Sequence, residues 1–157
     1  MVKILLICIG RLDRVMFAPA CAEYEKRLSR FCDLTIRELP EGTPPKNAGD
    51  IPRTLAMEAE KILALLAPGD NVTALCIEGK QLTSEELALR IGESMQTAAR
   101  LVFIIGSSHG LDPRVVQRAN RTLSMSKMTF PHQLARVMLL EQTYRAFTIL
   151  GGQTYHK

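Results

Sequence analysis

The sequence contains no tryptophan, and aromatic residues make up only 5% of its 157 residues. A protein that stacks base after base of a single-stranded nucleic acid needs more rings, so a broad stacking platform is excluded, while one or two rings could hold a single flipped base. Long hydrophobic runs are also missing. The longest apolar stretches fall well short of the roughly 20 residues of a membrane helix, and the apolar opening is too short for a signal peptide.

Cysteine is scarce as well, with residues only at Cys8, Cys21, Cys32 and Cys76. They form no C-x-x-C pair and have no closely spaced histidine, so we expect no zinc site or other metal centre. Cys8 and Cys76 lie inside apolar runs and are expected to be small buried hydrophobic residues. This use of cysteine is typical of a reduced, cytoplasmic protein.

The overall composition suits one soluble globular domain. Hydrophobic residues make up 46% and charged residues 23% of the chain, which provides a core and excludes a disordered or disulfide-dense protein. We therefore expect a single domain over residues 1–157.

The net charge of +4 is unevenly distributed. Residues 1–105 hold 13 basic and 14 acidic side chains, whereas residues 106–157 hold seven basic and two acidic ones. A basic end of this kind is typical of a protein that binds a polyanion. The alternative is a solvated surface that happens to be basic.

Apolar runs and amphipathic stretches alternate along the chain. Val2–Ile9, Val72–Ile77 and Leu101–Ile105 have the composition of buried strands, and the alternating segment Asp33–Glu38 that of a strand with one wet face. Amphipathic, helical stretches separate these strands. This alternation predicts an α/β fold, with a mostly parallel sheet and helices on both faces.

Three helices are predicted between the strands from apolar residues that recur every three or four positions. The first covers the stripe from Phe17 to Phe31, and the second begins near Asp50 and ends at Pro68-Gly69. The third begins at a capping box, Thr83–Glu86. The apolar face of this third helix, which we expect to be buried, consists of Leu87, Ile91 and Met95.

A final helix is predicted over about Gln133–Gly151. Val137, Leu140, Tyr144 and Phe147 form one apolar stripe, and further apolar residues lie on its other sides. A terminal helix that only covers a sheet needs one apolar face, so this pattern favours a homodimer in which the helix also contacts a second subunit. The alternative is a helix wedged deep in its own domain.

Ligands of open parallel sheets bind beyond the carboxyl ends of the strands. This rule selects three loops, Glu78–Lys80, Gly106–Gly110 and Ser124–Pro131, while the irregular segment Leu39–Gly49 is long enough to be functional as well. After the second loop, Asp112 and Pro113 are the expected start of the following helix. The two glycines allow close approach of a ligand, and a tight strand-to-helix turn explains them equally well.

Familiar catalytic and nucleotide-binding motifs do not occur in these loops. Gly106 and Gly110 have the wrong spacing for G-x-G-x-x-G, and Gly79-Lys80 lacks the first glycine and the final Ser or Thr of a Walker A loop. No G-x-S-x-G motif indicates a hydrolase. The histidines, which suit either phosphate contacts or plain exposed loops, are His109, His132 and His156.

Several longer motifs together resemble a known family. They are V-K-I-L-L-I-C-I-G at the start, P-P-K-N-A at Pro44–Ala48, C-I-E-G-K at Cys76–Lys80, I-I-G-S-S-H-G-L at Ile104–Leu111, S-K-M-T-F-P-H-Q-L-A-R-V at Ser126–Val137, E-Q-x-Y-R-A-F at Glu141–Phe147 and the terminal Y-H-K. In this order they resemble the RlmH family, the pseudouridine-N3 methyltransferases of large-subunit ribosomal RNA within the SPOUT class. The resemblance runs from Met1 to Lys157.

The resemblance implies a homodimer that uses S-adenosylmethionine and has a deep trefoil knot near its C-terminus. The cofactor positions of the family fall on Leu75, Gly106, Met125, Ser126, Lys127, Met128, Thr129 and Phe130. Backbone groups of such a pocket hold the adenine, and apolar side chains surround it. The sequence departs from the family at Ser107, where many members have glycine, and at the variable position His109.

The substrate implied is a pseudouridine of 23S ribosomal RNA, in a stem-loop at the subunit interface of the assembled ribosome, and neither membrane nor DNA is an expected partner. Methylation at N3 removes a proton from the ring, and basic groups stabilise the developing anion. The residues expected to take part are His132, Arg136, Arg145, Tyr155 and His156, the last two as a C-terminal tail. Positioning of phosphate groups is the alternative role for these residues. Alternative functions are a SPOUT methyltransferase of transfer RNA and a non-catalytic ribosome-binding factor.

Overall fold

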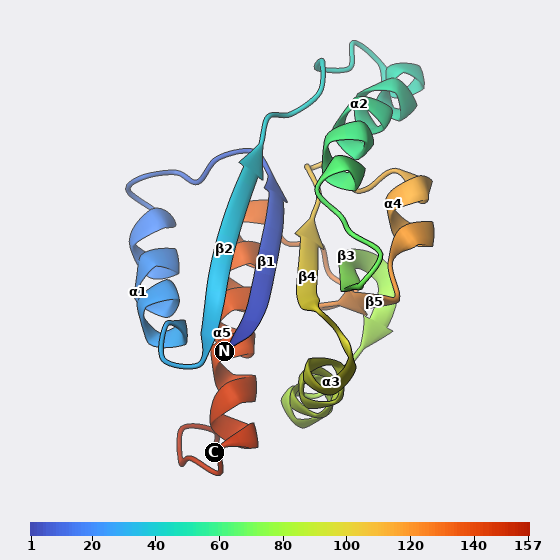
Figure 1. Cartoon of the computed structure of the whole chain (residues 1–157). Helices are drawn as coiled ribbons and strands as arrows, with labels where there is room; N and C mark the ends of the chain where they lie inside the picture. The colour runs from blue at the N-terminus through green and yellow to red at the C-terminus, as the bar shows by residue number, and fades with distance from the viewer.

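A computed structural model describes residues 1–157. The elements follow one another as β1 (Val2–Ile9), α1 (Ala18–Leu28), β2 (Cys32–Leu39), the short 3-10 helix η1 (Ala48–Asp50), α2 (Ile51–Ala64), β3 (Asp70–Gln81), α3 (Ser84–Thr97), β4 (Arg100–Ile105), α4 (Pro113–Arg118), β5 (Arg121–Ser124) and α5 (His132–Leu150). All five strands are parallel and form one sheet in the order β2-β1-β4-β3-β5 (Figure 1). The predicted α/β class with a parallel sheet is confirmed.

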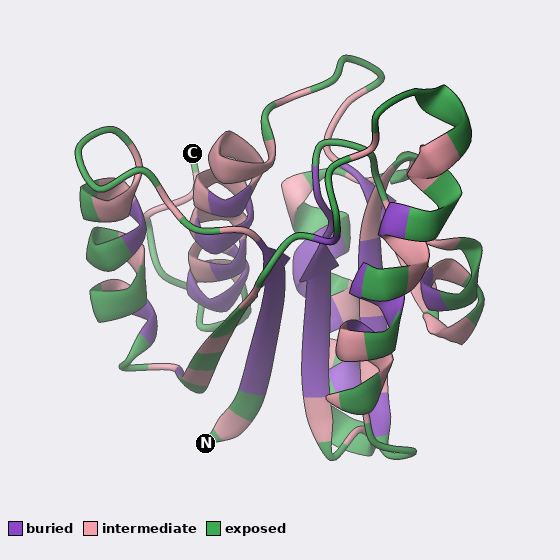
Figure 2. Cartoon of the chain, turned by 90° about the horizontal axis from the view of Figure 1, so that it is seen from above, coloured by how far each residue is buried: buried purple, intermediate pink, exposed green.

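The two central strands, β1 and β4, are buried on both faces (Figure 2). Alternate residues of β1 point to opposite sides of the sheet. Ile4, Leu6 and Cys8 belong to a core shared with α1, α3 and α5, whereas Leu5 and Ile7 belong to a second core shared with α2 and α4. The helices therefore cover both faces, as the continuous apolar runs of β1 and β4 predict.

The predicted boundaries hold best where the local pattern is strongest. β1 begins and ends as predicted, and Thr83 caps α3 in a complete capping box with Glu86. Asp112 caps α4 as expected, because its carboxylate accepts a hydrogen bond from the Arg114 N–H at 2.8 Å. β5 is an additional strand that the sequence pattern does not reveal.

Two residues that were expected to be buried are not. Met95 lies in the last turns of α3, and its exposed fraction is 38%, because the buried face of this helix passes through Ser94 instead. Cys76 is only half-buried, because it lies where the pairing of β3 with β5 becomes irregular. Cys8, in contrast, is buried as predicted, and burial raises the pKa of its thiol to about 12.

Helix α5 lies between α1 and α3 on one face of the sheet. Leu139, Leu140, Ala146 and Phe147 are buried there, and the ring of Phe147 stacks on Phe31 with centroids 5.5 Å apart. This packing accounts for much of the apolar surface of α5 within one chain. No helix of the structure combines the length and the apolarity that crossing a bilayer requires.

A buried ion pair joins the starts of β3 and β4. The guanidinium of Arg100 donates to both carboxylate oxygens of Asp70, at 2.9 and 2.7 Å, and to the carbonyl of Leu65 at 3.0 Å. The Asp70 side chain is only 3% exposed. Burial alone would raise the pKa of Asp70, but the hydrogen bonds from Arg100 and from the Ala67 N–H outweigh it and lower the pKa.

Replacing Asp70 with asparagine is expected to lower the free energy of unfolding at pH 7 by about 3 kcal/mol, because it leaves the Arg100 charge without its partner. A carboxylate whose pKa is lowered by folding stabilises the protein above about pH 4 and loses this effect as the pH falls through its folded pKa. The difference between the two proteins should therefore shrink in acid. Urea unfolding followed by circular dichroism at several pH values measures it; a difference that stays constant down to about pH 2 would contradict this assignment.

Candidate functional site

The carboxyl ends of β4, β3 and β5 meet at one edge of the sheet. Ala74 of β3 pairs with Ile104 of β4, and Leu75 pairs with Leu123 of β5. Neighbouring strands lie about 4.8 Å apart. Gly106, Leu75 and the segment that begins at Met125 therefore lie side by side, as the rule for parallel sheets predicts.

The first of the three predicted ligand loops belongs to a strand. Residues 78–80 lie within β3, which continues to Gln81 after a register shift between Leu75 and Lys80. A Cβ atom on Gly79 would lie 2.8 Å from the carbonyl carbon of Leu123, so glycine is required by the close approach of β5. The expectation of a loop here was wrong, because the polar residues after Ile77 pair with β5 instead of leaving the sheet.

The second loop is a tight turn between β4 and α4. The Gly110 N–H donates to the Ser107 carbonyl at 3.0 Å, and Gly110 has φ +92°, in the region that favours glycine. A Cβ atom on Gly106 would lie 2.3 Å from the Gly110 carbonyl oxygen. Both glycines are thus required by the turn itself, and His109 at its tip is exposed.

A buried glutamate that the sequence analysis missed holds this turn in place. Glu58 of α2 is 2% exposed and accepts a hydrogen bond from the Ser107 hydroxyl at 2.9 Å and one from the Gly42 N–H at 3.0 Å. The hydroxyl of Thr54, one helical turn earlier, donates to the Thr43 carbonyl. α2 therefore ties the long loop after β2 to the turn after β4.

The third loop, 125–130, presents backbone groups that have no partner in the protein. Its local bonds are those of two serines: the Ser124 hydroxyl donates to the Ser126 carbonyl, and the Ser126 hydroxyl accepts from the Met128 N–H. The N–H groups of Lys127, Thr129 and Phe130 donate to no protein atom. Met125 packs against the core, and Phe130 is half-buried. Free donors beside apolar side chains fit the edge and the faces of an adenine ring.

The first turn of α5 lies over the ends of β1 and β2. Arg136 is 2% exposed; its guanidinium donates to Glu38 at 2.8 Å and to the Gly10 carbonyl at 3.2 Å. A Cβ atom on Gly10 would lie 3.4 Å from Cε1 of His132, so the imidazole also lies at this edge. These contacts make Arg136 the residue that fastens α5 to the sheet.

Replacing Arg136 with methionine is expected to lower the free energy of unfolding by about 2 kcal/mol, because the Gly10 carbonyl and the Glu38 carboxylate, which is 38% exposed, lose their charged donor. Arg30→Met is the matched control, because Arg30 is exposed and makes no ion pair. Chemical unfolding of both variants measures the difference. An Arg136→Met variant as stable as the wild type would instead assign the residue to catalysis or substrate binding.

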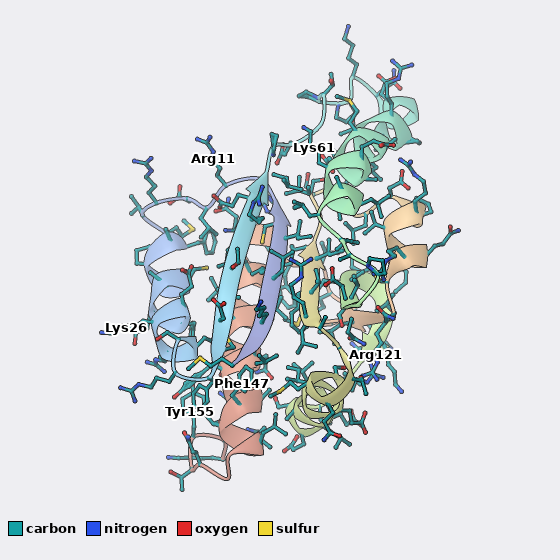
Figure 3. All side chains as sticks on the ribbon, in the orientation of Figure 1. Arg11, Lys26, Lys61, Arg121, Phe147 and Tyr155 are labelled. Atoms are coloured by element: carbon teal, nitrogen blue, oxygen red, sulfur yellow. The ribbon has the colours of Figure 1, made fainter.

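The other three predicted catalytic residues form a separate cluster at the far end of α5. Arg145 donates to Glu141 at 2.9 Å and to Nδ1 of His156 at 3.2 Å. Its guanidinium carbon lies over the Tyr155 ring, 4.8 Å from the ring centroid. Thirteen residues of helix separate His132 from Arg145, which is about 20 Å along the axis. Figure 3 shows Tyr155 beside Phe147, away from the Arg11 end of β1. Within one chain the five residues therefore do not converge on one point.

Glu141, Arg145, Tyr155 and His156 form a group that we call the tail cluster. Both ring nitrogens of His156 have a hydrogen-bond partner there. A guanidinium only donates, so Nδ1 accepts from Arg145, and the proton of the neutral ring lies on Nε2, 2.7 Å from Glu85. The hydrogen bond from His156 lowers the pKa of Glu85. Burial raises the pKa of Tyr155, so its phenol stays protonated at neutral pH and donates a hydrogen bond instead of acting as a base.

Three of the seven basic residues of the last third form ion pairs. Arg114 binds Glu60 and Asp112, Arg136 binds Glu38, and Arg145 binds Glu141. Arg118 donates to the Ala67 carbonyl. The cations that are exposed at the carboxyl edge without an ion pair include Arg11, Arg14 and Lys127. The charge distribution in the sequence therefore overstates the free positive charge of this third.

Two comparisons with known proteins identify the family of this chain. Residues 2–156 match the family described as "Predicted SPOUT methyltransferase". The chain is also 48% identical over 155 residues to the ribosomal RNA large subunit methyltransferase H of Bifidobacterium animalis subsp. lactis (strain AD011), with 97% of this chain and 98% of the relative covered. The chain belongs to the SPOUT methyltransferase family.

Proposed function

We propose that this protein transfers a methyl group from S-adenosylmethionine to N3 of a pseudouridine in 23S ribosomal RNA, on the assembled ribosome. The observation that carries the proposal is the similarity to a ribosomal RNA large subunit methyltransferase over nearly the full length of both chains. The choice of N3 and of pseudouridine rests on the family motifs, above all S-K-M-T-F-P-H-Q-L-A-R-V and the terminal Y-H-K.

The carboxyl edge of the sheet fits the cofactor. The unpaired N–H groups of Lys127, Thr129 and Phe130 would hold the adenine, while Leu75 and the turn at Gly106 would bound the pocket on the side of β3 and β4. When bound, S-adenosylmethionine supplies an electrophilic methyl group on a sulfonium. Glu58 contributes indirectly, because it fixes Ser107 and hence the turn.

The remaining residues would bind and prepare the nucleotide. His132 lies at the cofactor edge in no ion pair, and Arg11, Arg14 and Lys127 are exposed there to bind phosphate groups. In the tail cluster, Arg145 can stabilise the anion that forms when N3 loses its proton. His156 accepts that proton only after Nδ1 leaves Arg145, because Nε2 already carries the proton of the neutral ring.

The proposal includes a homodimer. Leu134, Val137 and Met138 of α5 stay half-buried in one chain, and Leu150 is 44% exposed, so α5 retains apolar surface for a second copy. The tail cluster and the His132 end of α5 are about 20 Å apart along the helix. Pairing of two copies allows the tail cluster of one to complete the cofactor edge of the other. Light scattering after size exclusion tests the pairing.

The proposal also includes the trefoil knot and a cytoplasmic location. β5 lies at one edge of the sheet, whereas Arg136 fastens α5 to β1 and β2, so residues 125–131 cross the carboxyl edge past the turn at Gly106. That crossing is where the chain would be threaded. All four cysteines are free, which supports a reducing compartment.

Two measurements test the function. Calorimetric titration with S-adenosylmethionine should show binding, and a folded protein that binds none would leave a non-catalytic ribosome-binding factor. Mass spectrometry of ribosomal RNA from a deletion strain should then show the loss of one methyl group on a pseudouridine of 23S RNA. A missing methyl group on transfer RNA, with ribosomal RNA unchanged, would overturn the assignment of the substrate.

A further inference from the structure

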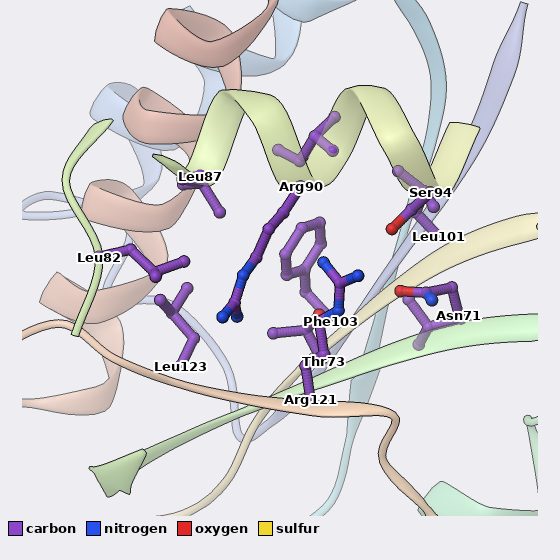
Figure 4. A pocket seen from close by; sticks show the side chains of 12 residues that line it. Asn71, Thr73, Leu82, Leu87, Arg90, Ser94, Leu101, Phe103, Arg121 and Leu123 are labelled. Carbon is purple, nitrogen blue, oxygen red and sulfur yellow. The ribbon is translucent and has the colours of Figure 1, made fainter. Parts of the chain in front are cut away.

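A small crevice lies between α3 and the strands β3, β4 and β5. We call it the α3–β5 crevice. Its apolar lining includes Phe103 and Leu123, and its polar lining includes Asn71, Thr73 and Ser94. Figure 4 shows two arginines reaching into it from opposite walls, Arg90 from α3 and Arg121 from β5. None of the residues that line the crevice is acidic.

The two arginines differ from the other five that follow residue 80. Arg100, Arg114, Arg136 and Arg145 each pair with a carboxylate, and Arg118 binds a backbone carbonyl. Neither Arg90 nor Arg121 takes part in an ion pair, and Nη1 of Arg121 is a buried nitrogen with no hydrogen-bond partner. A buried guanidinium N–H without an acceptor in the protein is unfavourable, so Arg121 is suited to an acceptor that a ligand supplies.

The chemical form of a suitable acceptor follows from the donors around it. Two guanidinium groups in a lining without acidic residues favour an anion, and their planar forks bind the oxygens of a phosphate in pairs. The Thr73 and Ser94 hydroxyls and the Asn71 amide add neutral donors in the same lining. Both arginines are half-buried, so neither side chain is sealed inside the core.

We propose that the α3–β5 crevice binds a phosphate group of the RNA backbone through Arg90 and Arg121. This inference rests on the proposed RNA substrate. Arg121 precedes Ser124, the end of β5, by three residues, which is about 10 Å of strand. A backbone phosphate held there lies close to the segment 125–130 at which the proposed cofactor site begins. The crevice thus extends the docking surface to the β5 edge of the molecule.

The test uses the full-length protein and compares Arg121→Met and Arg90→Met with the control Arg30→Met, which removes an equal charge from an exposed arginine outside the crevice. The first probe is inorganic phosphate at constant ionic strength, followed by NMR of the arginine Nε–Hε resonances. Saturable shifts of the Arg90 and Arg121 signals are expected. In Arg90→Met the shift of the Arg121 signal should be lost, and in Arg121→Met that of the Arg90 signal. Circular dichroism verifies that the variants fold, and Arg121→Lys, which keeps the charge, should restore part of the binding.

The second probe is a fluorescein-labelled fragment of large-subunit ribosomal RNA, titrated at several salt concentrations. Arg121→Met should bind it about tenfold more weakly than the control does. The slope of log K against log salt should fall by about 1, as the loss of one phosphate contact requires.

Each other outcome has a distinct meaning. Arginine signals that phosphate does not shift would overturn the inference, as would a phosphate site whose loss leaves RNA affinity and salt slope unchanged. Weakened binding of ribosomes with unchanged binding of the RNA fragment would also overturn it and assign the crevice to a ribosomal protein. A wild-type protein that shows both expected results but methylates no RNA would leave the inference standing and disprove the proposed function.

Discussion

Replacing Gly106 with alanine is expected to lower the affinity for S-adenosylmethionine by about 100-fold, because a displacement of about 1 Å in a positioning element has effects of that size. The new Cβ atom would lie 2.3 Å from the Gly110 carbonyl oxygen and 2.9 Å from Cδ2 of Leu111. The turn must open to admit it, at a cost of about 3 kcal/mol in unfolding free energy. Isothermal titration calorimetry and urea unfolding measure the two effects.

The matched control is Gly69→Ala, the same change at the other end of the sheet. A Cβ atom on Gly69 would lie 3.2 Å from the Cβ of Ala99, which a small shift relieves, and Gly69 has no left-handed φ. This variant should bind the cofactor like the wild type. Unchanged cofactor affinity in Gly106→Ala would show that the turn after β4 does not form part of the cofactor site.

Removal of Tyr155–Lys157 is expected to reduce methyl transfer by at least about 100-fold, the usual contribution of groups that move or stabilise a proton. The binding of S-adenosylmethionine should stay near normal, because the tail contacts Glu141, Tyr144, Arg145 and Glu85 and no residue of the segment 125–130. Transfer of a radioactive methyl group to ribosomes, measured beside calorimetry, separates the two properties. Full activity of the truncated chain would contradict a chemical role for the tail.

Co-expression sharpens this experiment. A mixed dimer of the truncated chain with Gly106→Ala contains one intact cofactor edge and one intact tail, on different chains. If the tail serves the partner's site, the mixed dimer should recover up to half of the wild-type activity per dimer, whereas neither parent is active. Lys157→Ala is the control for the tail, because this exposed residue makes no ion pair.

The parts of the fold that could be predicted are those in which one short stretch carries its own pattern. The continuous apolar run of β1 and the capping box before α3 specify their elements locally, and the structure agrees with both. β5 has four residues, of which only Leu123 and Ser124 are buried, so it shows no periodicity. β3 continues through polar residues and Gly79 because β5 approaches its backbone, a contact between distant segments.

The site was predictable as an edge of the sheet, but not in its polar contacts. The family motifs and the strand ends indicate the same loops, and the register of β3 with β4 and β5 brings them together. Glu58 was overlooked because glutamate is ordinarily a surface residue. It lies four residues after Thr54 and four before Ile62, and all three are buried on α2. The helical spacing therefore indicated that Glu58 lies on the buried face of the helix. The burial of Arg136 could not be foreseen, because its partner Glu38 lies 98 residues away.

The strand order determines when this protein can fold during its synthesis. β1 is synthesised first, yet one of its two neighbours is β4, with Ile4 opposite Leu101. The core on that face is completed only by Leu139, Leu140, Ala146 and Phe147 of α5. Until about nine-tenths of the chain has emerged from the ribosome, β1 therefore lacks partners for part of its apolar surface.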